Sequence, residues 1–236
     1  MKKELNLFAF FVIIVLFSTS CKKDNINETY SCNPEINQWT KTNLKSVQLL
    51  TRVEIAQLPS SKQRAVWRTL SAERKLEIWK DKYAEMSKLN WTVEERNHLE
   101  LLINELKVEY FLEPTSIEII EIQNIGDQFL LAWMSFAQSE LHWNQNFIYS
   151  IGFRLDNPLN NNKLLETNSS NLSDEQGPPP PGPIACACNA SDPGNDFCGA
   201  FDMLECVSGA CTVSEEGCGW WWNHACDGTC KFKNTH

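Results

Sequence analysis

Residues 186–236 read CACNASDPGNDFCGAFDMLECVSGACTVSEEGCGWWWNHACDGTCKFKNTH and hold eight of the ten cysteines in a chain of 236 residues. A segment this short buries too little apolar surface to fold without covalent cross-links. Cysteines at this density supply such cross-links in an oxidising compartment. We therefore expect internal disulfides, with the pairing left open among about a hundred connectivities. The eight cysteines are Cys186, Cys188, Cys198, Cys206, Cys211, Cys218, Cys226 and Cys230.

A zinc site is the alternative use of these cysteines. Structural zinc sites have closely spaced cysteine pairs at two places in the chain. Only Cys206 with Cys211, and Cys226 with Cys230, approach that spacing, and His224 is the one nearby histidine. The pattern favours disulfides, and we expect neither a metal nor a cofactor.

An uninterrupted tryptophan triplet, Trp220, Trp221 and Trp222, lies among these cysteines. Frequent glycines around it predict turns and short strands. Neighbouring side chains in a strand alternate between two faces, so the three indoles cannot all point one way. We expect one or two to shield disulfides and fill the core, and at least one to be exposed. The exposed tryptophans are candidate binding residues for protein, glycan or lipid.

The first twenty residues have the form of a secretory signal peptide. Lys2 and Lys3 precede an apolar run over residues 7–17, which is too short to span a bilayer as a helix. Small residues then lead to Cys21, and this arrangement resembles the lipobox of bacterial lipoproteins, although Ser18 stands where leucine is usual. The resemblance implies that Cys21 carries acyl chains, such as palmitate, that anchor the mature protein in a membrane. Residues 21–37 are then a lipidated tether, in which Cys32 is an unassigned thiol.

The middle of the chain, residues 38–155, has a helical pattern. Apolar residues recur at helical spacing, and Ser60, Ser71 and Thr92 have the form of helix N-caps. The runs 117–125 and 129–136 predict two further helices with a break at Gly126. Four to six amphipathic helices with short connections predict a small bundle. Five tryptophans of this region are expected in its core: Trp67, Trp79, Trp91, Trp133 and Trp143.

Residues 156–185 separate the helical domain from the cysteine-rich module. They are rich in asparagine, serine and proline, with four prolines in a row at 178–181. Such a composition predicts a disordered linker with a semi-rigid polyproline segment. We expect it to hold residues 186–236 away from the helical domain.

No stretch of the chain has the form of a known catalytic motif. There is no zinc-protease helix motif, no phosphate-binding glycine loop and no nucleophile elbow. The net charge of −9 argues against a nucleic-acid partner. We expect a protein that is not an enzyme and has no catalytic residues.

The cysteine-rich end resembles fulvocin C, a bacteriocin, and the larger fulvocin C-related proteins. The helical region also looks like the N-terminal part of those larger proteins. The resemblance covers about a fifth of the chain and implies an antibacterial ancestry for the module. It rests on the following short matches: Cys186-Ala-Cys188, Ser191-Asp192, Phe197-Cys198, Gly209-Ala210-Cys211, Gly217-Cys218-Gly219 and Cys226-Asp227-Gly228.

Two functions follow from these features. The first is a membrane-anchored lipoprotein presenting a bacteriocin-like module that acts through a receptor. Residues 186–236 carry two basic and seven acidic residues, a net charge of −5, which disfavours direct attack on anionic membranes. The alternative is a non-toxic binding or display protein that contacts a cell-surface protein or glycan. In both, the protein is exported to the bacterial cell envelope as an outer-membrane lipoprotein, facing the periplasm or the cell surface. The expected fold is mainly α, with a helical bundle and a disulfide-rich, turn-rich module.

Overall fold

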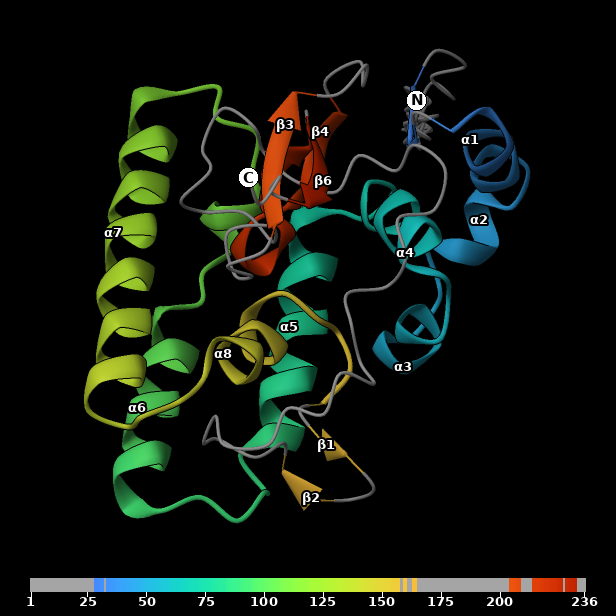
Figure 1. Ribbon diagram of the computed structural model, residues 1–236. Coiled ribbons are helices and arrows are strands. Elements are labelled where there is room, and N and C mark those ends of the chain that lie inside the picture. The colour runs from blue at the N-terminus through green and yellow to red at the C-terminus, as the bar shows by residue number, and fades with distance from the viewer. Residues whose placement is uncertain are drawn as a thin grey trace, which may run out of the picture.

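The computed structural model describes residues 28–31, 33–157, 159–160, 163–164, 204–208, 214–226 and 228–232. The predictions for the signal peptide, Cys21, Cys32 and most of the linker lie outside these residues. Within the described part the protein is mainly helical, as the sequence predicts, and short strands form the C-terminal end (Figure 1). None of the described helices is long and apolar enough to cross a membrane.

The first helices of the chain are short, and longer helices follow them. The helices are α1 (Pro34–Thr42), α2 (Leu44–Val47), α3 (Arg52–Ala56), α4 (Ser60–Trp67), α5 (Ala72–Met86), α6 (Val93–Glu105), the 3-10 helix η1 (Val108–Phe111), α7 (Ile117–Ser139) and α8 (Gln145–Gly152). In Figure 1, α5 runs through the middle of the molecule, with α6 and α7 on one side and α1 to α3 on the other.

Side-chain caps fix where several of these helices begin. Ser71 accepts a hydrogen bond from the third residue of α5, and Thr92 forms a complete capping box with Glu95, both as predicted. The N-cap predicted at Ser60 is wrong, because Ser60 is the first residue of α4 and the N-cap position is held by Pro59, which makes no side-chain hydrogen bond. Gln63 instead donates to the carbonyls of Ala56 and Leu58 and so ties α4 to the preceding turn.

The predicted break at Gly126 is also wrong, because α7 is one continuous helix of 23 residues. Gly126 is buried, and a Cβ added there would lie 2.4 Å from Cε1 of Tyr110. The glycine therefore allows the close approach of an aromatic ring, with the helix geometry unbroken.

The helical domain reaches beyond its predicted limits of 38 and 155. Tyr30 is buried and its carbonyl accepts a hydrogen bond from Arg68, so the chain is already packed where a tether was expected. At the other end, Asn157 donates to Glu85. A small antiparallel hairpin pairs β1 (Leu159–Asn160) with β2 (Lys163–Leu164) inside the predicted linker.

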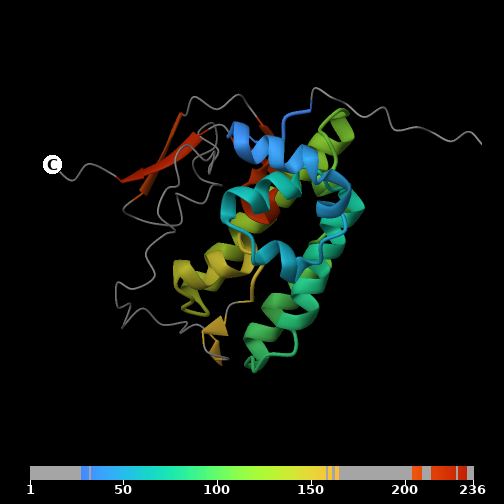
Figure 2. The ribbon, with the colours of Figure 1, turned by 90° about the vertical axis from the view of Figure 1, so that its right-hand side faces the viewer.

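The C-terminal strands form two antiparallel pairs. In the first, β3 (Leu204–Ser208) pairs with β6 (Gly228–Phe232), which places Cys206 opposite Cys230. In the second, β4 (Ser214–Cys218) pairs with β5 (His224–Cys226). The 3-10 helix η5 (Trp220–Trp222) connects β4 to β5 and lies among the helices (Figure 2).

One aromatic core joins the helices to this C-terminal connection. The five tryptophans expected in the helical core are all buried, as predicted. The same cluster contains the three tryptophans of η5. Helical domain and C-terminal hairpin therefore share a core, and the prediction that the linker holds the module away from the bundle is wrong.

Candidate functional site

The β4–β5 hairpin carries the tryptophan triplet at its tip. A disulfide joins Cys218 to Cys226 across the base of this tip, with a sequence separation of 8. Cys206 is also disulfide-bonded, so at least two bridges cross-link the C-terminal end. The predicted disulfides are confirmed for these three cysteines, and the others predicted there lie outside the described side chains.

The backbone of the tip has an uncommon conformation. The φ angles are 72° at Gly219, 54° at Trp221 and 58° at Trp222. A residue with a Cβ adopts this left-handed conformation at a cost of about 1–2 kcal/mol. Two consecutive tryptophans can hold it only where their surroundings fix them, and here the contacts with the helical domain do so.

We call Trp220, Trp221 and Trp222 the tryptophan plug, because they fill the centre of the helical domain. Their side chains are 0%, 0% and 4% exposed. The prediction of an exposed contact surface at the plug is therefore wrong. Burying the apolar surface of three indoles in the helical core is more favourable than leaving it in water. The hairpin is short enough to place all three side chains there.

Each indole of the plug packs on a different aromatic group. Trp220 meets the ring of Trp133 edge-on, with ring centroids 5.5 Å apart. Trp221 stacks on Tyr110 at 5.4 Å, and Trp222 meets Trp67 edge-on at 5.4 Å. Such aromatic pairs add stability beyond simple burial, by about 0.5–1.5 kcal/mol each.

Indole N–H groups also bond the plug to the helices in both directions. Trp67 and Trp79 donate to the carbonyls of Trp222 and Trp221, at 2.9 and 3.0 Å. In return, Trp221 donates to the Tyr83 hydroxyl at 2.7 Å. Trp222 donates to the Phe153 carbonyl at 2.8 Å. These bonds satisfy buried polar groups of the plug and of the helical domain. They therefore fix the position of the hairpin against the helices.

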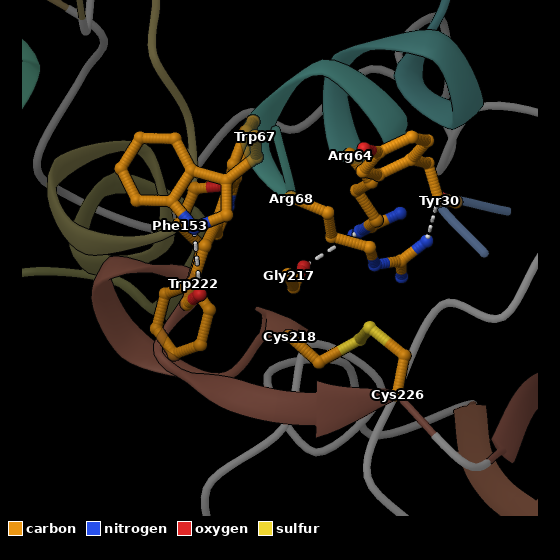
Figure 3. Close-up of a disulfide and its surroundings, with 9 residues drawn as sticks. All are labelled: Tyr30, Arg64, Trp67, Arg68, Phe153, Gly217, Cys218, Trp222 and Cys226. Atoms are coloured by element: carbon orange, nitrogen blue, oxygen red, sulfur yellow. Dashed lines mark hydrogen bonds between the residues drawn. A yellow bond between two sulfur atoms is a disulfide. The ribbon is translucent and has the colours of Figure 1, made fainter. Parts of the chain in front are cut away.

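Arg64 of α4 bonds to the base of the hairpin, and Arg68, which directly follows α4, bonds to the N-terminal segment (Figure 3). Arg64 donates to the carbonyl of Gly217 at 2.9 Å, and Arg68 donates to Tyr30 at 2.7 Å. Burial, and then repulsion from Arg64, lowers the pKa of Arg68 to about 10, so that it remains charged at neutral pH. In β5, Nε2 of His224 lies 3.3 Å from Oδ1 of Asp127 in α7.

A glycine of α8 makes room for the plug. A Cβ added at Gly152 would lie 2.3 Å from Cε2 of Trp220, far inside van der Waals contact. In an unpacked helix, replacing glycine by alanine would stabilise the protein by about 1 kcal/mol. Here the added methyl group collides with a fully buried ring.

We therefore expect Gly152→Ala to lower the free energy of unfolding by about 1–3 kcal/mol, the range for an overpacked core. Urea denaturation followed by circular dichroism measures this change. Ser139→Ala, at an exposed position near the end of α7, is the control and should change stability by less than about 0.5 kcal/mol. A stabilised Gly152→Ala protein would show that Trp220 does not occupy this contact.

Two buried lysines lie beside the helical tryptophans that donate hydrogen bonds to the plug. The ammonium group of Lys75 lies 5.8 Å from the ring centroid of Trp67, and that of Lys82 lies 5.0 Å from Trp79. Lys82 also donates to three backbone carbonyls, at 2.5 to 2.7 Å. Its ammonium group therefore satisfies carbonyls at the end of α8 and in the turn that follows, which is a structural role.

Lys75 predicts a pH dependence of stability. Burial, opposed by Glu113 and reinforced by Arg68, lowers the pKa of Lys75 from 10.5 to about 8. Between these pH values the unfolded chain binds a proton that the folded chain has released, so the contribution of Lys75 to stability rises with pH. We expect urea midpoints of the wild-type protein to rise relative to those of Lys75→Met between pH about 8 and about 10. Parallel pH profiles of the two proteins would contradict this assignment.

A small open pocket lies beside α3, with a volume of about 260 Å³. Arg52 lines it, but this side chain already donates to Asp81, Glu85 and the carbonyl of Leu155. Its donors are thus used within the fold. Over the described ranges of the chain, no group of three or more histidine, cysteine or acidic side chains has an arrangement that could hold a metal ion.

The comparisons with known proteins add no relative. No family model matches the chain, and neither a curated protein nor a solved structure matches it. The partners of the tryptophan plug, chiefly Tyr83, Tyr110 and Gly152, were not identified from the sequence. The one local signal was the run of three adjacent tryptophans, of which only one or two were predicted to be buried.

Proposed function

We propose that the protein is an exported, lipid-anchored component of the bacterial cell envelope, whose cysteine-rich end is a fixed part of the folded body. The observation that supports a fixed cysteine-rich end is the burial of the tryptophan plug in the helical domain. A module released from this position would expose three indoles and leave a large cavity among the helices, at a cost of several kcal/mol. This arrangement supports a non-toxic binding or display protein over a bacteriocin that leaves its carrier.

Export to an oxidising compartment is supported by the Cys218–Cys226 disulfide. Anchoring rests on the lipobox-like sequence that ends at Cys21. Mass spectrometry of the membrane-bound protein should show acyl chains on Cys21, and Cys21→Ser should lose that mass. An unchanged mass would refute the anchor and leave the role of the plug untouched.

An antibacterial precursor is the second candidate, because the same burial would let the helical domain act as an inhibitor of the module. The two proposals differ once the linker is cut. A protease site placed within residues 177–183 allows cleavage of the otherwise intact mature protein. We expect the two pieces to remain together in gel filtration without denaturant, held by the plug.

Growth-inhibition assays on related bacteria complete this experiment. The cut protein should have no activity if the envelope role is right. Separation of the pieces, with growth inhibition by the released C-terminal piece, would instead establish the antibacterial precursor. An uncut protein carried through the same steps is the control for contaminating activity.

A further inference from the structure

The Cys218–Cys226 disulfide closes the loop that carries the tryptophan plug (Figure 3). Three residues of this loop, Gly219, Trp221 and Trp222, have left-handed backbone conformations. A free chain rarely adopts such conformations at residues that carry a Cβ. The bridge limits the conformations of the undocked loop, and so it reduces the entropy that is lost when the plug docks.

Backbone pairing alone holds the β4–β5 hairpin weakly. Among the described residues, the two strands form a sheet of only two strands. Their register is irregular between Ser214 and Cys218. Because an isolated two-stranded hairpin is marginally stable in water, the disulfide is the main constraint on this hairpin before it meets the helices.

The helical domain is in turn incomplete without the plug. The three indoles contact aromatic rings of α4, α5, η1 and α7. An undocked plug leaves these elements around a cavity, which destabilises them. Formation of the disulfide, docking of the plug and completion of the helical core are therefore coupled.

The sulfur atoms of the bridge are covered once the plug has docked. Cys218 and Cys226 are 2% and 0% exposed. Thiol–disulfide exchange requires that a thiolate reach one of the two sulfur atoms. The bridge therefore forms while the hairpin is free, and the docked plug then protects it from reduction.

We propose that the Cys218–Cys226 pair is a redox switch for assembly of the helical core. The reduced chain does not seat the plug stably, and the oxidised chain does. The coupling goes beyond the proposed function and is independent of the lipid anchor.

The oxidant of this switch is itself a disulfide, either oxidised glutathione or a disulfide-carrying protein. One cysteine thiolate attacks it and displaces one of its sulfur atoms, and the second cysteine then displaces the other. One S–S bond breaks and another forms. The oxidant leaves as two thiols, which carry the protons and electrons that the cysteines have lost.

Chemical denaturation of the mature chain carrying Cys21→Ser tests the coupling, with far-ultraviolet circular dichroism as the readout of the helices. This parent chain is compared with one that also carries Cys218→Ala and Cys226→Ala, each with and without a phosphine reductant. Reductant should lower the folding equilibrium constant of the parent by about a hundredfold, as expected for a cross-link around a short loop. The double variant should resemble the reduced parent and respond much less to reductant.

The reduced parent keeps both sulfur atoms, so its agreement with the double variant separates the cross-link from the packing of sulfur. Two results would overturn the proposal. One is an equal effect of reductant on the two chains, which would assign the effect to other bridges. The other is an oxidised double variant whose helices unfold at the same denaturant concentration as those of the oxidised parent.

The rate of reduction is a second measurement, which decides the matter if the double variant does not fold. Alkylation of the released thiols, followed by mass spectrometry, measures reduction at Cys218 and Cys226. Gly152→Ala, whose added methyl group collides with Trp220, should be reduced about tenfold faster than the parent. Ser139→Ala should be reduced at the parent rate. A bridge that is reduced as fast in the native parent as in urea would contradict the protection by the plug and overturn the proposal.

Discussion

Replacing Trp221 by alanine should lower the free energy of unfolding by about 3–5 kcal/mol, the range for removing a large buried aromatic side chain. Trp221 is 0% exposed and stacks on Tyr110. Its indole N–H is bonded to the Tyr83 hydroxyl. The truncation therefore opens a cavity and leaves a buried hydroxyl with one partner fewer. Because small domains are stable by only about 5–15 kcal/mol, much of the fold's stability is at stake.

The informative readout is the behaviour of the helices. Chemical denaturation followed by far-ultraviolet circular dichroism reports mainly on the helical domain, which contributes most of the secondary structure. If the plug belongs to the core of that domain, the helical transition itself moves to lower denaturant concentration. Leu49→Ala, at an exposed position, should leave the transition in place. A helical domain that unfolds in Trp221→Ala as in the wild type would contradict the shared core.

Tyr83→Phe separates the hydrogen bond from the packing. The ring of Tyr83 remains stacked on Trp79, and the hydroxyl that is lost accepts from the Trp221 N–H at 2.7 Å and donates to the Ile151 carbonyl at 3.4 Å. An indole N–H left buried without its partner should cost about 1–3 kcal/mol. This smaller loss, next to the larger one for Trp221→Ala, assigns the difference to aromatic packing.

Lys82→Met should also cause a large loss, of about 2–4 kcal/mol. The lysine is 0% exposed, and its ammonium donates to the carbonyls of Ser150, Ile151 and Arg154. Methionine keeps much of the volume but supplies no donor, so these acceptors lose their partner, at about 1–3 kcal/mol for a buried group. Burial lowers the pKa of Lys82 well below its usual value, and relief of that cost offsets part of the loss.

Lys80 provides the matched control for this substitution. It lies on α5 two residues before Lys82 and is exposed. Lys80→Met should change the free energy of unfolding by less than about 0.5 kcal/mol. Equal effects of the two substitutions in urea denaturation would show that the three carbonyl contacts do not contribute to stability.

Together these variants bear on function as well as stability. If the plug and the helices are one cooperative unit, the cysteine-rich end cannot separate from the helical domain unless that domain unfolds. Any partner of the whole protein must then contact residues other than the buried tryptophans.

Local patterns in the sequence were enough for the helical class, for caps at Ser71 and Thr92, and for the disulfide-linked turns of the C-terminal end. These features depend on residues close together in the chain, whose spacing follows the helix or strand period. The burial of Trp67 and Trp79 was predictable for the same reason. The break expected at Gly126 failed because the local signal of a glycine does not show which ring packs on it.

The sequence by itself determined that three adjacent tryptophans lie in a short cross-linked turn, and only the tertiary structure decided that all three are buried. The bonds that place them, from Trp67 to Trp222 and from Trp221 to Tyr83, span 155 and 138 residues of chain. No periodicity reports contacts over such distances. They arise because a short cross-linked hairpin and a helical domain with an open aromatic centre each lower their free energy by burying the same apolar surface.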